Sequence, residues 1–167
     1  AVTDTDIVDN VIEDCADGIV FTAGGGDLDD CDVKNNEITG ADNNGAIVFL
    51  GGNDDIDIQD NTITGNDSAG IYFDAAGAVC NNIDIKGNDI SDNDADGIWI
   101  DTAVAPTDLV IMNNTIANNE DAGLVVDTWE DESCILMFNN IVDNDDSVDA
   151  AADVTNAYFN WWGSDDE

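Results

Sequence analysis

The segment IDIQDNTITGNDSAGIYFD, residues 56–74, decides the fold class. Apolar Ile56, Ile58 and Ile63 alternate with polar residues, and a second short alternating run follows Gly70. A period of two residues is typical of β-strands that bury one face. The segment therefore predicts two strand-like runs separated by turns, and the alternation places Asn61 on the inside.

The same pattern recurs along nearly the whole chain. Periods of 25 to 27 residues separate the copies and indicate a solenoid. No copy has helical spacing over a window long enough for a helix, which argues against leucine-rich, ankyrin and tetratricopeptide solenoids. We therefore expect an all-β parallel β-helix of about six coils. The asparagines that anchor the copies are Asn10, Asn36, Asn61, Asn88, Asn114 and Asn139.

Stacking explains how asparagines can be buried. Successive coils of a β-helix are about 4.8 Å apart, so each side-chain amide can donate to the amide carbonyl of the next copy. This contact satisfies a buried polar group. A second series of asparagines falls five residues after the first in four consecutive copies, so we expect two internal ladders. The second series is Asn66, Asn93, Asn119 and Asn144.

These repeats resemble the right-handed parallel β-helix repeat proteins of the pectate-lyase-like superfamily, whose coils carry N-x-I and N-x-x-x-x-G-I motifs. The segment YFNWWGS, residues 158–164, is similar to the segment that follows the last coil in such proteins. The resemblance implies a single-stranded right-handed β-helix over residues 1–156 and an aromatic, acidic tail over residues 157–167. We expect the chain to be a domain of a longer protein, or a subunit whose ends are covered by neighbours.

The composition is strongly acidic. Thirty-nine acidic residues against two lysines, without arginine or histidine, give a formal net charge of −37 over 167 residues. Such self-repulsion requires screening, and the excess of Asp is similar to that of proteins from salt-loving microbes, where molar salt shortens the screening length to about 3 Å. We therefore expect a halophilic origin, and a calcium-rich but otherwise ordinary environment is the alternative. The charge disfavours anionic substrates, and we expect no nucleic-acid partner.

The sequence gives little support for catalysis. Polysaccharide lyases of the resembled superfamily use an arginine or lysine base beside calcium-binding aspartates, and its hydrolases add histidine, arginine and lysine. A carboxylate pair alone could still act as acid and base, but we name no catalytic residue and expect no organic cofactor. We expect a non-catalytic secreted or cell-surface module with a structural or assembly role and no membrane insertion. The alternative is a carbohydrate-active β-helix that binds or hydrolyses polysaccharide.

Two aspartate columns follow from the repeat. One stands four residues before the anchoring asparagines, and the other follows the second strand. Oxygen-only ligation suits Ca²⁺ and other hard cations, so both columns are candidate metal ligands. A charge-compensated solvated face and turn capping are the alternatives. The residues are Asp32, Asp57 and Asp84 in the first column, and Asp74, Asp101 and Asp127 in the second.

Two further surfaces are apolar. Tyr72 and Trp99 share an outward column, where they could stack on a sugar ring or pack against a loop or another subunit. In the last copies, columns that are charged earlier become apolar, and we predict an interface there. Either the tail with Trp161 and Trp162 folds back over it, or a neighbour covers it by self-association, head-to-tail into a filament, or by docking of another domain. The interface residues are Val110, Met112, Ile135, Met137 and Phe138.

The four cysteines are expected to be mostly free thiols. Cys31 and Cys134 occupy inward positions in copies several coils apart, too far for a disulfide. Cys15 and Cys31 are the pair most worth checking.

Overall fold

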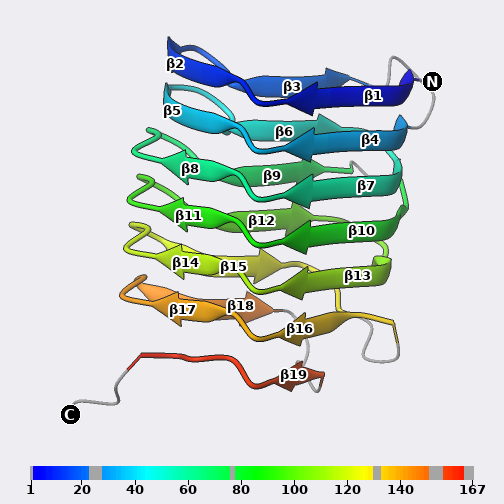
Figure 1. Cartoon of the computed structure of the whole chain (residues 1–167). Helices are drawn as coiled ribbons and strands as arrows, with labels where there is room; N and C mark the ends of the chain where they lie inside the picture. Colours follow the sequence, from blue (N-terminus) through cyan, green and yellow to red (C-terminus); the bar gives the residue numbers. More distant parts are fainter. Residues whose placement is uncertain (1, 23–27, 76–77, 130–132, 151–155, 164–167) are drawn as a thin grey trace.

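The computed structural model describes residues 2–22, 28–75, 78–129, 133–150 and 156–163, and every regular element among them is a β-strand. The strands form three parallel sheets of seven, six and six strands, which are the faces of one solenoid built from stacked coils (Figure 1). The expected parallel β-helix is therefore confirmed. Six coils of three strands are followed by one further strand, so the expected number of coils differs only slightly from the observed one.

Each sheet collects one strand from every coil. Sheet A contains β1 (Val2–Val8), β4 (Leu28–Lys34), β7 (Asn53–Gln59), β10 (Cys80–Lys86), β13 (Thr107–Met112), β16 (Ile135–Met137) and β19 (Ala157–Tyr158). Sheet B contains β2 (Val11–Cys15), β5 (Glu37–Ala41), β8 (Thr62–Thr64), β11 (Asp89–Ser91), β14 (Thr115–Ala117) and β17 (Asn140–Val142). Sheet C contains β3 (Ile19–Thr22), β6 (Ile47–Leu50), β9 (Ile71–Asp74), β12 (Ile98–Asp101), β15 (Ala122–Val126) and β18 (Asp146–Ala150).

Each coil has three strands where the sequence predicted two runs, and that prediction was wrong. The first predicted run is divided by a corner between β7 and β8, at the residue before the buried asparagine. Asp60 has a φ of 53° there, and Asp is among the residues that adopt this left-handed conformation most readily. The inward positions shift by one residue across the corner, from Ile56 and Ile58 before it to Asn61 and Ile63 after it, and the prediction of a single run overlooked this shift.

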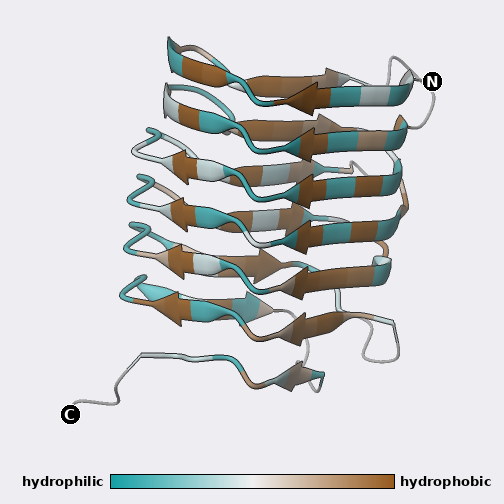
Figure 2. Cartoon of the chain, in the orientation of Figure 1, coloured by the Kyte–Doolittle hydropathy of each residue, from teal (hydrophilic) through white to brown (hydrophobic). Residues whose placement is uncertain are grey.

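The core is one continuous stack of inward side chains. Ile56 pairs in register with Ile83, and the rings of Phe49 and Phe73 stack with centroids 4.6 Å apart. Gly97 lies where a Cβ would come within 2.6 Å of the carbonyl oxygen of Gly123, so this column accepts almost no side chain. Apolar and polar residues alternate along most strands of sheet A (Figure 2), as one buried and one solvated face require.

Both asparagine ladders are present, and their amides are paired. The backbone N–H and the side-chain amide of Asn61 each donate to Oδ1 of Asn88 at 3.0 Å. The side-chain amide of Asn66 donates to Oδ1 of Asn93 at 2.8 Å. The first ladder also contains Asn160, which sequence reasoning missed because it follows only 21 residues after Asn139. The Phe-Asn pair at residues 138–139 and again at residues 159–160 was the available signal.

The tail continues the solenoid. β19 pairs with β16, and Trp161 forms a β-bridge with Asn140. Trp161 and Trp162 are themselves exposed, and Ile135 and Phe138 remain 36% and 49% exposed, so the tail does not seal the outward face at β16. The boundary between residues 156 and 157 stays a prediction, because residues 151–155 and 164–167 lie outside the described part of the chain. All four cysteines are free thiols, including Cys15 and Cys31.

Candidate functional site

The outward face of sheet A carries the first aspartate column. Asp32, Asp57 and Asp84 lie in register on β4, β7 and β10. The ammonium of Lys34 is 2.9 Å from a carboxylate oxygen of both Asp32 and Asp57, and Lys86 pairs with Asp84. These contacts neutralise part of the repulsion within the column.

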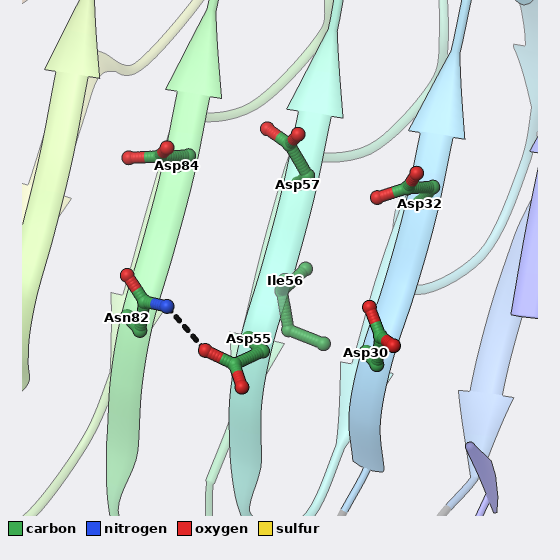
Figure 3. A pocket seen from close by; sticks show the side chains of 7 residues that line it. All are labelled: Asp30, Asp32, Asp55, Ile56, Asp57, Asn82 and Asp84. Atoms are coloured by element: carbon green, nitrogen blue, oxygen red, sulfur yellow. Dashed lines mark hydrogen bonds between the residues drawn. The ribbon is translucent and has the colours of Figure 1, made fainter. Parts of the chain in front are cut away.

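A second polar row runs beside this column and completes a shallow acidic depression of about 260 Å³ (Figure 3). Asp30, Asp55 and Asn82 form the row, and the amide of Asn82 donates to Asp55. A hydrogen bond with Asp4, loss of hydration and repulsion from neighbouring carboxylates raise the pKa of Asp30. Among the described residues, no group of three or more His, Cys, Asp or Glu side chains is arranged to hold a metal ion. The depression is therefore an open charged surface without a chelating cage.

The outward face of sheet C brings the predicted aromatic pair next to the second aspartate column. The rings of Tyr72 and Trp99 have centroids 4.8 Å apart and are inclined by 31°. Asp74 and Asp101 are in register at the ends of β9 and β12, and Asp127 follows β15. The cluster offers an aromatic face beside carboxylates, an arrangement suited to a polar ring with hydroxyl groups.

Burial and neighbouring carboxylates raise the pKa values of two side chains in this cluster, Tyr72 and Asp127. Burial, followed by repulsion from Asp74 and Asp101, raises the pKa of Tyr72 to about 12. Burial also raises the pKa of Asp127, with further contributions from a hydrogen bond to Asp101 and repulsion by it. Both shifts favour the protonated form, so the cluster binds protons more tightly than isolated side chains do.

The last coils expose an unusual concentration of large apolar side chains, which we call the aromatic surface. Phe138 and Phe159 are 49% and 78% exposed, and their rings stack with centroids 5.2 Å apart and planes 7° apart. Both have a φ of 58°, a left-handed conformation that is a real outlier for a bulky residue. The surface comprises Ile135, Phe138, Tyr158, Phe159, Trp161 and Trp162.

The predicted interface residues overlap the aromatic surface, because Ile135 and Phe138 belong to both sets. Val110 lies in register with Ile135, and Met112 with Met137, on the outward face of β13 and β16. Tyr158 of β19 follows Met137 in the same column. The structure thus brings these residues together on the part of sheet A where the polar alternation of earlier coils gives way to apolar residues (Figure 2). Their role as an interface stays a prediction.

Soft metal donors are few and mostly hidden. The chain has no histidine, four cysteines and two methionines. Cys31 and Cys134 are fully buried, and Cys80 is 1% exposed. Burial raises the pKa of Cys31 and Cys80, which disfavours the thiolate that binds metals. Cys15 is half-buried in the first coil. Among the described sulfur-containing residues, Met112 and Met137 are the pair that lies in register on the outward face of neighbouring strands.

The model of the family described as periplasmic copper-binding protein (NosD) matches residues 1–166. Neither the search of curated proteins nor the search of solved structures gave a match. The family's description names copper, and the expectation of Ca²⁺ or another hard cation as cofactor was therefore wrong. That description places the family in the periplasm, on the outer side of the cytoplasmic membrane. No helix among the described residues is long and apolar enough to span a membrane. The match over nearly its whole length shows that the chain belongs to the NosD family.

Proposed function

We propose that this chain is a non-catalytic β-helix scaffold that works outside the cytoplasm and self-associates through its aromatic surface. The observation that carries the proposal is the pair of stacked phenylalanines in left-handed corners, Phe138 and Phe159. The corresponding corners of the earlier coils hold the residues that tolerate this conformation. These are Asp9, Asn35, Asp60, Gly87 and Asn113.

The two phenylalanines cost stability in the isolated chain. A left-handed conformation costs roughly 1–2 kcal/mol for a residue with a Cβ atom, and exposed rings recover little of this by burial. Phe159 is 78% exposed, so its contact with Phe138 leaves most of the ring in water. Strain of this kind concentrates at functional sites. A second molecule that covers both rings would recover about 1.5–3 kcal/mol for each.

The charge of the chain makes a local apolar contact necessary for association. With a formal net charge of −37, two copies repel each other unless salt screens them. The aromatic surface is the place where burial can offset this repulsion, because it gathers five aromatic side chains on adjacent coils. Self-association is therefore expected in molar salt and is suppressed in dilute buffer.

The strand edges offer a second contribution. Among the described strands, β1, β2 and β3 at one end of the solenoid and β18 and β19 at the other each have one edge without a strand partner. Parallel edges of this kind accept a further coil. Head-to-tail stacking of copies into a filament or a surface layer would extend all three sheets in register, because such a contact need not close.

The experiment compares the wild-type chain with Phe138→Asn/Phe159→Asn by light scattering in molar NaCl. Asparagine stands at the equivalent corner in two other coils, so the variant keeps a favourable backbone residue while removing both rings. We expect wild type to exceed the monomer mass of 17.6 kDa and the variant to be monomeric. The matched control, Val104→Asn, removes an exposed apolar residue between β12 and β13, away from both ends of the solenoid, and should not change the mass. Equal masses for wild type and the double variant would refute the role of this surface.

We further propose that the copper binding named in the family's description extends to this chain. Copper in its Cu(I) state prefers soft sulfur ligands. Histidine is absent and three thiols are buried, but the two half-buried methionines share one outward column, so thioether ligands for Cu(I) are available, whereas the imidazole nitrogens that suit Cu(II) are not. Bound copper would supply a soft Lewis-acid centre that takes up further sulfur ligands.

Carbohydrate binding is a second candidate function, and the Tyr72–Trp99 pair favours it. The rings lie next to Asp74 and Asp101, which can accept hydrogen bonds from sugar hydroxyls. Uncharged oligosaccharides are the appropriate probes, because the chain repels anionic ones. A glycan array in molar salt, with Trp99→Ala compared with the wild type, tests this candidate. Binding that survives the substitution would exclude this face as the site.

A further inference from the structure

We infer that Met112 and Met137 form a Cu(I) site on the outward face of sheet A, an inference that rests on the copper binding proposed above. They are the only two methionines of the chain. β13 and β16 bring them into direct register, and both side chains are half-buried.

The spacing of the pair suits a metal bound between two sulfur atoms. Neighbouring strands of a sheet are about 4.7–4.9 Å apart. Metal–sulfur bonds are about 2.3 Å long in zinc sites, so two of them in line span about 4.6 Å. Flexible methionine side chains can adjust to the small difference. Two in-register methionines on adjacent parallel strands can therefore hold one soft cation without any movement of the backbone.

The neighbours of the pair favour a soft monovalent ion. The outward residues beside the methionines on the same strands are Val110 and Ile135, which offer no oxygen ligands. Hard cations need several oxygen ligands, whereas Cu(I) is selected by sulfur. The surrounding negative charge of the chain raises the local concentration of any cation.

Residues above and below complete the column. Lys86 is in register with Met112, and its ammonium is paired with Asp84, so its repulsion of a cation is reduced. Tyr158 follows Met137 on the other side and is 51% exposed. An aromatic face can stabilise a nearby cation.

The other sulfur atoms do not provide an equivalent site. Cys31, Cys80 and Cys134 lie in the core on different coils, and entry of a metal would require opening of the solenoid. Cys15 is the most accessible thiol. A stable site at Cys15 alone would need further ligands, and it serves as the control below.

The test is an anaerobic titration of the reduced chain with Cu(I) in competition with the chelator bicinchoninate. Wild type should take up one Cu(I) per chain. Met112→Leu/Met137→Leu should weaken Cu(I) binding at least tenfold, while Cys15→Ala should bind as the wild type does. Leucine has nearly the same volume as methionine, so the fold should be retained, and a thermal melt of each variant without copper verifies this. X-ray absorption of the copper-loaded wild type should show sulfur neighbours.

The results distinguish a failure of the methionine site from a failure of copper binding by the chain. Absence of stoichiometric Cu(I) uptake by the wild type overturns both. Uptake that is unchanged in the double methionine variant, or that is lost in Cys15→Ala, leaves copper binding standing and overturns the methionine site. An absorption spectrum with only nitrogen and oxygen neighbours also overturns it.

Discussion

Oδ1 of Asn160 accepts hydrogen bonds from both the backbone N–H and the side-chain amide of Asn139, at 2.9 and 3.0 Å. The side-chain amide of Asn160 in turn donates to the carbonyl of Leu136 at 2.9 Å. The ladder therefore continues from the sixth coil into the tail without a break. Because each amide pairs with the next coil and with a backbone carbonyl, the ladder ties successive coils together through buried polar contacts.

Asn88→Leu should lower the free energy of unfolding by about 3 kcal/mol or more. The substitution removes the acceptor of two hydrogen bonds from Asn61, as well as the donor to Asn114 and to the carbonyl of Ile58. A urea titration in molar salt measures the loss. Asn43→Leu, at an exposed position, is the matched control and should change stability by less than about 0.5 kcal/mol. Equal effects at both positions would contradict the ladder account.

Phe138→Asn and Phe159→Asn should each stabilise the isolated chain, by up to about 1 kcal/mol, because asparagine adopts the left-handed corner at lower cost. The reverse exchange, Asn113→Phe, places a bulky residue in a corner with a φ of 57° and should destabilise by a similar amount. Thermal melts at low protein concentration measure both effects without a contribution from association. A loss of stability in the two asparagine variants would show that the rings serve the fold of the single chain.

Stability should rise steeply with NaCl concentration between dilute buffer and molar salt. Repulsion among 39 acidic residues is long-ranged, and the screening length falls from about 30 Å at 0.01 M salt to about 3 Å at 1 M. The melting temperature of the wild type across this range tests the expectation. An unchanged melting temperature would contradict both this expectation and the halophilic origin expected from the composition.

Stability should increase as the pH falls from 7 toward 4 at fixed ionic strength. The pKa values of Asp96 and Asp127 are raised in the folded chain above the ordinary value of 3.8, chiefly by burial. The folded state therefore binds more protons than the unfolded state between 3.8 and the raised values, and this contribution is lost as the pH rises through them. Urea titrations at a series of pH values measure the trend.

Asp127→Asn isolates one of these groups. It should stabilise the chain at pH 7 by less than about 1 kcal/mol, because Asp127 is only partly buried and solvent screens its charge, and it should flatten the pH dependence. Asp42→Asn removes the same charge at an exposed site and corrects for the change in net charge. A pH dependence that is identical in the two variants would contradict a special role for Asp127.

Sequence periodicity was sufficient to predict the solenoid fold because the same pattern of buried and exposed residues recurs in every coil. The period, the buried asparagines and the in-register aspartates all followed from residue spacing alone. The third strand of each coil did not, because the prediction treated Ile56 to Ile63 as one run and overlooked the shift of the inward positions at the left-handed Asp60. Asn160 was missed for a related reason, since the shorter sixth interval hides it from a search at constant period.

The candidate sites were less predictable. Columns such as Asp32, Asp57 and Asp84 could be aligned from the sequence, but aspartates are so frequent here that alignment could not distinguish metal ligands from a surface neutralised by lysine. The strained conformation of Phe138 and Phe159 depends on backbone angles, which residue identity does not reveal. The prediction of a hard cation failed because carboxylates dominate the composition, whereas the family's description names copper.

The most direct test of the scaffold account is sedimentation equilibrium of the wild-type chain in molar NaCl over a hundredfold range of protein concentration. The account predicts a mass that rises with concentration above the monomer value of 17.6 kDa, because burial of the aromatic surface depends on a second copy. A mass that stays at the monomer value over the whole range would contradict self-association as the function of this surface.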